Sequence, residues 1–284
     1  MAWSPLWIAR ALVRIVRVVV VRITPRWQRS AHANLQVALP ELSQSERDHV
    51  VSGVYENLAR NVFMLARLPR FNEHNIGECV SYDGLEYYKS GIEQGRGGLF
   101  LTAHLGSWEL SSAAHALFGN AMSVMVRTLD NPLLDQLVNG RRELFGNRVI
   151  RKHEAARDTL KALRRNEAVG ILADQNTIGT DGVFIEFFGR PASATKSVAQ
   201  FARQTGAAVV FGFCLWDRSA ARFVLRFRPV EMAETDDREA DLVENTQRCQ
   251  TAIEQAVREF PDQWLWIHDR WKNSPTVDQL SSVD

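Results

Sequence analysis

The sequence lacks several features that would place the protein in a broad class. It has no run of about 18 uncharged apolar residues, as an ordinary membrane-spanning helix requires. Its three cysteines form no CxxC pair, which argues against a disulfide framework or a structural zinc site and fits a reducing compartment. The formal net charge is +1, so the overall basicity expected of a nucleic-acid-binding protein is missing. No repeat or long linker divides the 284 residues. They suffice for one well-buried core.

The first 25 residues are apolar except for regularly spaced arginines. On a helix, Arg10, Arg14 and Arg17 fall within about 60° of each other, and apolar residues occupy most of the remaining circumference. A narrow arginine stripe beside a wide apolar face suits the membrane interface. A signal peptide and a helix packed on the protein body are the alternatives, but no small-residue cleavage site follows. We expect a membrane-association helix over residues 1–25 and a single domain over 26–284.

The remainder of the chain alternates between helical and strand patterns. Helices are expected at 26–38 and 43–68, and buried strands at 98–104, 121–127, 168–174 and 207–216, with helices at 107–117, 132–145, 154–165 and 195–204 between or after them. This alternation predicts an α/β fold with a mostly parallel central sheet flanked by helices. The period-two pattern of 222–231 is typical of an edge strand, and a last helix is expected at 241–259.

Three chemically capable residues end predicted strands. His104, Arg127 and Asp174 each stand at the carboxyl end of a buried apolar run. The crevice outside the carboxyl ends of parallel strands is where open α/β sheets bind ligands. The sequence therefore predicts a functional site at this edge of the sheet.

His104 and Glu109 form a His-x4-Glu spacing, a weak signal because about one His-x4-acid pair is expected by chance. A second pair, His153 and Asp158, lies in a charged stretch and is interpreted as incidental. Residues five apart on a regular helix point about 140° away from each other, so they meet only if the histidine precedes the first turn. Gly106 would supply the joint there.

In that arrangement Glu109 would hold one ring nitrogen of His104, and the other nitrogen would accept a proton. Ser107 would cap the following helix. Backbone amides near Gly106 and Ser107 are candidates for stabilising an oxyanion. The simpler alternative is a strand-end histidine that only hydrogen-bonds the helix cap.

The segment TAHLGSWEL, with His104 and Glu109, resembles the signature of glycerolipid-type acyltransferases. The glutamate form resembles the lipid A biosynthesis acyltransferases within that superfamily. Four further blocks agree in order and spacing: VRTLDNPLLD (126–135), ILADQN (171–176), GVFIEFFGRPASATKS (182–197) and WLWIHDRWK (264–272). Family members often carry a cleaner N-terminal transmembrane helix, so the arginines leave open whether residues 1–25 span the membrane or lie on it.

The resemblance implies a substrate site that includes the following residues: Arg127, Asn131, Asp174, Gln175 and Lys196. Arg127 has the chemistry to bind a phosphate or phosphopantetheine, and pairing with Asp130 is its alternative. Buried Asp174 needs partners, and capping a loop explains it almost as well. Residues 191–195 are expected to open a helix whose amides attract an anion, reinforced by Lys196.

Two aromatic stretches have two interpretations each. The apolar residues between Gly182 and Gly189 suit the wall of an acyl-chain tunnel or the protein core. The second stretch suits a lipid headgroup layer or closure of the core, through Trp264, Trp266, Trp271, Arg270 and Lys272.

The resemblance implies an enzyme that transfers a fatty acyl chain from a thioester of acyl carrier protein or coenzyme A to a hydroxyl of a membrane glycolipid, in the first place a lipid A precursor. His104 would act as the general base, with no cofactor, metal or nucleic acid involved. The expected place is the cytoplasmic face of the inner membrane. Alternatives are a lysophospholipid acyltransferase, an acyl thioesterase and a non-enzymatic lipid-binding protein.

Overall fold

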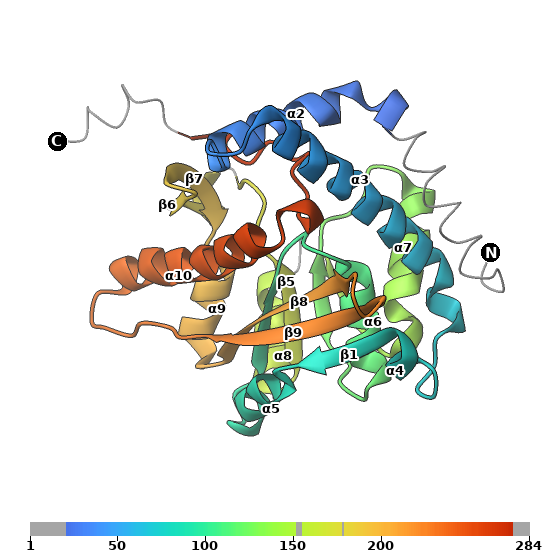
Figure 1. The fold of residues 1–284 in the computed structure, drawn as a ribbon. Coiled ribbons are helices and arrows are strands. Elements are labelled where there is room, and N and C mark those ends of the chain that lie inside the picture. The colour runs from blue at the N-terminus through green and yellow to red at the C-terminus, as the bar shows by residue number, and fades with distance from the viewer. Residues whose placement is uncertain (1–20, 152–154, 178, 275–284) are drawn as a thin grey trace.

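The computed structural model describes residues 21–151, 155–177 and 179–274, and its centre is a seven-stranded sheet (Figure 1). The strand order is β1-β9-β8-β2-β5-β3-β4. Their bounds are Val80–Asp83 (β1), Gly98–Thr102 (β2), Ser123–Val126 (β3), Arg148–Arg151 (β4), Ala168–Leu172 (β5), Ala208–Asp217 (β8) and Arg222–Val230 (β9). All neighbouring strands are parallel except β8 and β9. The predicted α/β fold with a mostly parallel sheet is confirmed.

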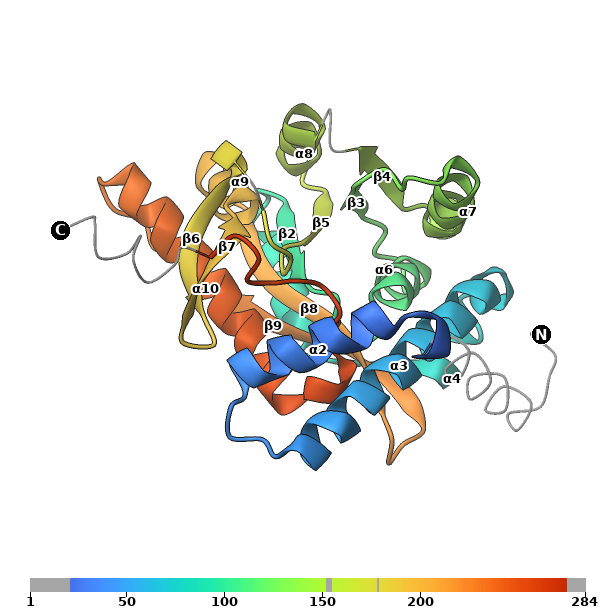
Figure 2. The same ribbon diagram turned by 90° about the horizontal axis from the view of Figure 1, so that it is seen from above.

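Helices cover both faces of the sheet (Figures 1 and 2). On one face, Leu99 and Leu101 of β2 share a core with α8 (Ala155–Arg164), α9 (Ser197–Thr205) and α10 (Arg238–Glu259). On the other face, Phe100 packs in a second core with α5 (Leu85–Glu93) and α6 (Trp108–Leu117). Successive strand residues point to opposite faces, so a continuous apolar run such as β2 feeds both cores.

Two long helices, α2 (Pro25–Ala38) and α3 (Gln44–Arg67), cross one end of the sheet (Figure 1). The predicted start of α3 is confirmed: Ser43 and Glu46 form a reciprocal capping box. A short 3-10 turn, η4 (Pro261–Gln263), packs against α3 and follows α10. Helix α3 is thereby in contact with the segment that follows α10.

Two sequence predictions about this fold are wrong. The strand at 222–231 is not an edge strand, because β9 pairs with both β8 and β1, and the four-residue β1 is at the edge. Residues 191–195 do not open a helix. They form β7 (Arg190–Thr195), which pairs with β6 (Gly182–Phe187) in a separate antiparallel hairpin, and α9 begins after Lys196.

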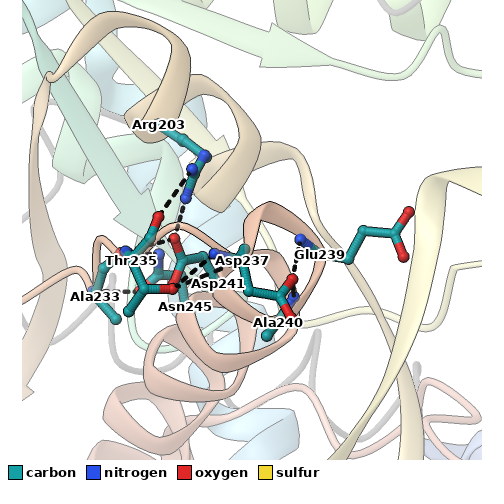
Figure 3. Close-up of polar contacts among 8 residues, drawn as sticks. All are labelled: Arg203, Ala233, Thr235, Asp237, Glu239, Ala240, Asp241 and Asn245. Carbon is teal, nitrogen blue, oxygen red and sulfur yellow. Dashed lines mark hydrogen bonds and ion pairs between the residues drawn. The ribbon is translucent and has the colours of Figure 1, made fainter.

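The connection from β9 to α10 is fixed by a polar cluster (Figure 3). Asp241, which is 2% exposed, pairs with Arg203 of α9 and accepts hydrogen bonds from the amide and hydroxyl of Thr235. Asn245 holds both the N–H and the C=O of Ala233. The buried polar groups satisfy one another and join α9 to α10.

No helix in the described part of the chain is long and apolar enough to cross a membrane. The predicted membrane-association helix at residues 1–25 falls mostly on residues 1–20, which are outside the described residues. The division into 1–25 and a single domain over 26–284 therefore stays a prediction.

Candidate active site

His104 and Asp174 meet at the carboxyl edge of the sheet, as their strand-end positions predict. His104 follows β2 and Asp174 follows its neighbour β5. The Nδ1 atom of His104 lies 2.8 Å from one carboxylate oxygen of Asp174, and the backbone N–H of His104 donates to the other oxygen at 2.9 Å. The Asp174 side chain is 2% exposed and that of His104 is 21% exposed. A buried carboxylate thus holds a histidine whose ring still reaches solvent.

Asp174 is held as an anion. Burial alone would raise the pKa of its carboxyl, but the electrostatic interaction with His104 and hydrogen bonds from His104 and Trp264 outweigh burial and lower the pKa. The indole N–H of Trp264 donates to Asp174 at 2.8 Å. Because the carboxylate is an acceptor only, it fixes a proton on Nδ1 of His104 and leaves Nε2 as the basic nitrogen.

Glu109 does not hydrogen-bond His104 in the described chain, contrary to the sequence expectation. Its carboxylate accepts two hydrogen bonds from Arg142 of α7 (Pro132–Arg142), at 2.9 and 2.5 Å. Glu109 lies in the first turn of α6, where it faces α7, and a bidentate guanidinium pair occupies both of its oxygens. The carboxylate that orients His104 in this structure is Asp174.

The turn between His104 and α6 is fixed by close packing and by backbone hydrogen bonds. Gly106 has φ +65°, and a Cβ at this position would collide with the carbonyl of Cys214. The amides of Gly106 and Ser107 donate to Gln263 and Cys214 at 2.9 and 2.7 Å. Neither amide is free to stabilise an oxyanion here, so this expectation needs correction. Ser107 takes the N-cap position of α6, but its side chain makes no capping hydrogen bond.

Residues that the sequence analysis missed hold this turn in place. Asn57 and Asn61 of α3 both donate to the carbonyl of Gly106, at 2.9 and 2.8 Å. Both asparagines are buried, one helical turn apart. The sequence shows two amide side chains among the apolar residues of a long helix. It does not show their partner, a backbone carbonyl 45 residues or more further along the chain.

Gln175 and Trp108 border the outer nitrogen of His104. The side-chain nitrogen of Gln175 lies 3.5 Å from Nε2, and the ring of Trp108 packs edge-on at 5.1 Å. His268, also missed, accepts the N–H of Asn176 at 3.3 Å. Burial lowers the pKa of His268, so this side chain is a neutral acceptor that supports the turn carrying Asp174 and Gln175.

A narrow apolar cavity lies between the sheet and helices α6 and α7; Trp108, which packs against His104, lines it, whereas His104 and Asp174 do not. Phe100, Thr102, Val124, Gly170 and Leu172 line its sheet side; Trp108 lines its other wall, with Glu109 and Arg142. Its volume is about 40 Å³, enough for a few water molecules. A second cavity of about 180 Å³ lies at the hairpin and includes Val183, Phe184 and Ser193. Among the described residues, no group of three or more His, Cys, Asp or Glu is placed to hold a metal ion.

Comparison with known proteins decides the family. The model of the bacterial lipid A biosynthesis acyltransferase family matches residues 2–273. The chain belongs to this family. It is 24% identical to the lipid A biosynthesis myristoyltransferase of Escherichia coli K12 over 242 residues, which cover 84% of this chain and 73% of that protein.

Two other relatives agree. The chain is 24% identical to the lipid A biosynthesis lauroyltransferase of Escherichia coli K12 over 256 residues, 90% of this chain and 82% of that one. It is 24% identical to lipid A biosynthesis acyltransferase 1 of Shigella flexneri over 242 residues, with coverages of 84% and 73%. The resemblance found in the sequence is confirmed, and the protein is an acyltransferase.

In this acyltransferase the remaining predicted substrate residues are spread along the same edge. Arg127 is 78% exposed and pairs with Asp130 at 3.1 Å, the alternative that the sequence left open. Asn131 is committed to capping α7, since its side-chain oxygen accepts from the amides of Leu133 and Leu134. Lys196 precedes α9 and is half-buried.

The aromatic tail of the acyltransferase closes the core. Trp264 and Trp266 are 2% and 0% exposed, and Arg270 is fully buried. The guanidinium of Arg270 donates to the carbonyl of Ser193 at 2.5 Å, and burial lowers its pKa to about 10. These three side chains are therefore not available to a lipid headgroup layer, whereas Trp271 is half-buried and Lys272 is exposed. Their signal in the sequence was the WLWIHDRWK block, but its buried position was not predictable.

Proposed function

We propose that this acyltransferase moves a fatty acyl chain from a thioester of acyl carrier protein or coenzyme A to a hydroxyl of a membrane glycolipid, a lipid A precursor. The observation that carries the proposal is the His104–Asp174 pair, which Trp108 joins to an apolar cavity. The activities for which these relatives are named, lipid A myristoyl and lauroyl transfer, support the choice of acceptor.

His104 acts as the general base through Nε2. Its Nδ1–H is held by Asp174, so the basic nitrogen points to the acceptor hydroxyl. As that proton moves to Nε2, the hydroxyl oxygen attacks the thioester carbonyl carbon. The tetrahedral intermediate then expels the thiolate, which takes the proton from the imidazolium. The anionic Asp174 stabilises the imidazolium between these steps.

The oxyanion has other donors than those expected from the sequence. We assign it to the first-turn amides of α6, because the N-terminus of a helix carries partial positive charge and this one lies beside His104. The amide side chain of Gln175 is the second candidate, 3.5 Å from the reactive nitrogen.

The acyl chain would enter the cavity between the sheet and α6–α7. A volume of about 40 Å³ is far too small for a fatty chain, so α7 must shift outward on binding. The Glu109–Arg142 pair joins the two helices at this place and would control that movement. Gly170 lines the cavity, and a Cβ there would meet the sulfur of Met122 at 3.2 Å and Val124 at 3.5 Å, so a larger side chain would narrow the space further.

Two cations at this edge would serve the polar part of the donor or acceptor. Exposed Arg127 can exchange its pairing with Asp130 for a phosphate at little cost, and half-buried Lys196 is the second cation. No cofactor or metal enters this scheme. The place of action that fits a membrane glycolipid is the cytoplasmic face of the inner membrane, with peripheral or N-terminal attachment.

The test is acyl transfer by the purified full-length protein in detergent. Donors are labelled acyl carrier protein and acyl coenzyme A, and acceptors are a lipid A precursor and a lysophospholipid. His104→Ala and Asp174→Asn should each lower kcat/KM by about 10²–10⁴-fold. His74→Ala, at a side chain that is 85% exposed, is the matched control and should leave it unchanged. Glu109→Gln tests the other carboxylate: a loss equal to that of Asp174→Asn, with a changed pH profile, would restore the His-Glu pairing.

The products separate the alternatives. Transfer to the lysophospholipid alone changes the acceptor but keeps the mechanism. Acyl release without any lipid acceptor identifies a thioesterase. Lipid binding that is equal in wild type and His104→Ala, with no transfer to any acceptor, means a lipid-binding protein and refutes the proposal.

A further inference from the structure

Helix α7 buries two polar side chains and exposes its three leucines. Its two buried residues are Asp135 and Asn139, which are 6% and 7% exposed. Leu133, Leu134 and Leu137 are 76%, 51% and 51% exposed. A helix on the surface of a protein in water normally shows the opposite arrangement.

The two kinds of residue occupy opposite sides of α7. At about 100° per residue, the three leucines span a sector of about 100°, whereas Asp135, Asn139 and Arg142 fall within about 60° on the far side. The inward side is fully engaged: Asp135 accepts from the amide of Leu129 and from Arg151, and Arg142 donates to Glu109. Rotating the helix to bury the leucines would break all of these contacts.

The exposed leucines are concentrated rather than scattered. Of the eleven large apolar side chains exposed in the described chain, five lie between residues 129 and 144. Leu129, 40% exposed, joins the three leucines of α7. We call Leu129, Leu133, Leu134 and Leu137 the leucine face. Single exposed leucines need no explanation, but a contiguous apolar patch marks an interaction surface.

The leucine face lies at the catalytic edge of the sheet. Since β3 and β4 are parallel, the helix that joins them starts at the carboxyl edge, where His104 and Asp174 also lie. The leucines belong to the loop after β3 and to the first two turns of α7. The leucines therefore lie on the side of α7 that faces away from the cavity to which the helix contributes Arg142.

Positive charge surrounds this face. Residues 127–151 contain five arginines and three acidic residues, a surplus of two positive charges in a chain whose total is +1. Arg127, at the end of β3 and two residues before Leu129, is 78% exposed and has only an exposed ion pair, whereas Arg151 is paired with Asp135 on the inward side of α7. Apolar side chains bordered by arginines are complementary to a bilayer with anionic headgroups.

We propose that the leucine face inserts into the surface of a bilayer containing anionic lipids and so places the catalytic edge against the membrane. The proposal deepens the proposed function, on which it rests for the presence of a membrane lipid substrate. The inserted leucines replace their contact with water by contact with acyl chains, while Arg127 binds lipid phosphate. Helix α7 then lies between the bilayer and the cavity that would receive a fatty chain.

The first test is sedimentation of the full-length protein with vesicles of phosphatidylcholine, with and without phosphatidylglycerol. Leu133→Ser and Leu137→Ser should each lower partitioning into the anionic vesicles about tenfold. Val243→Ser, at an apolar position of α10 that is 44% exposed, is the matched control and should bind as wild type does. All three sites are exposed, so the melting temperature should not change.

A second measurement reports on this face even if other parts of the chain also bind vesicles. A polarity-sensitive fluorophore on Leu134→Cys should shift to the blue when anionic vesicles are added, whereas the same label on Val243→Cys should not. Wild type carrying the label on Cys79, the one half-buried cysteine, gives the background.

A label at 134 that stays in water on vesicle-bound protein overturns the proposal. A label that is shielded before vesicles are added also overturns it, because another part of the chain or a second copy then covers the face. These outcomes are independent of the proposed function, which falls only if wild type fails to transfer acyl groups in detergent.

Discussion

Buried His115 is expected to make the acyltransferase unstable in mild acid. The side chain of this residue of α6 is fully buried among Tyr82, Tyr88, Phe100 and Phe227. Its Nδ1 accepts the hydroxyl of Tyr82 at 2.6 Å, and its Nε2 has no partner among the described residues. Burial lowers the pKa of His115 to about 3, so the folded protein holds it neutral.

The magnitude follows from linkage. The unfolded chain takes up a proton on His115 below about pH 6.5, whereas the folded chain does not until about pH 3. The stability is therefore complete above about pH 6.5 and is lost progressively as the pH falls toward 3. Each pH unit in this window costs about 1.4 kcal/mol, so His115 alone removes about 2 kcal/mol between about pH 6.5 and 5.

The assay is denaturant unfolding of wild type and His115→Gln at several values between about pH 7 and 5. Glutamine keeps an acceptor for Tyr82 and does not titrate. Other groups contribute equally to both proteins, so the difference between the two curves isolates His115. The wild type should lose about 2 kcal/mol more than the variant over this range.

Parallel loss of stability in the two proteins would refute the reasoning. A direct check does not depend on the variant: the ring signals of His115 in the native protein, followed by NMR, should show no protonation above about pH 4. Titration near the ordinary histidine pKa would mean that the ring is not enclosed as the structure has it.

Three further outcomes are expected. Gly106→Ala should lower the free energy of unfolding by about 2–4 kcal/mol and reduce kcat, since the new Cβ collides with Cys214 and displaces His104; denaturation and transfer assays measure both. Asp241→Asn should cost about 2–3 kcal/mol by leaving Arg203 half-buried without its partner, yet leave kcat and KM unchanged below the melting temperature. Gly170→Val should favour shorter acyl donors by at least about tenfold in relative kcat/KM, whereas Phe184→Ala should leave the preference for chain length unchanged. A changed preference in Phe184→Ala alone would place the acyl chain at the hairpin cavity.

The sequence by itself determined the class of fold and the edge that carries the chemistry. Buried strands read as continuous apolar runs, and the residue after each run stands at the carboxyl edge whatever the order of the strands. His104 and Asp174 could therefore be placed on the same edge without any knowledge of their neighbours. The five motif blocks led to the family, because their order and spacing are a property of the chain alone.

Only the tertiary structure decided which carboxylate holds His104. Strand order makes β2 and β5 neighbours, and this brings Asp174 to His104 across 70 residues, while Arg142 draws Glu109 away. Local spacing favoured Glu109 because it contains no information about competing partners. The same limit explains Asn57, Asn61 and His268, whose partners are backbone groups distant in sequence.

Helix α7, with its leucines exposed, shows most clearly what the sequence and the tertiary structure each decide. Its sequence has polar and apolar residues at helical spacing, and such a pattern ordinarily predicts that the leucines face the core. The fold buries the other side because Asp135 and Arg142 find charged and backbone partners there. Periodicity specifies that a helix has two faces; the partners that tertiary structure supplies decide which of the two is buried.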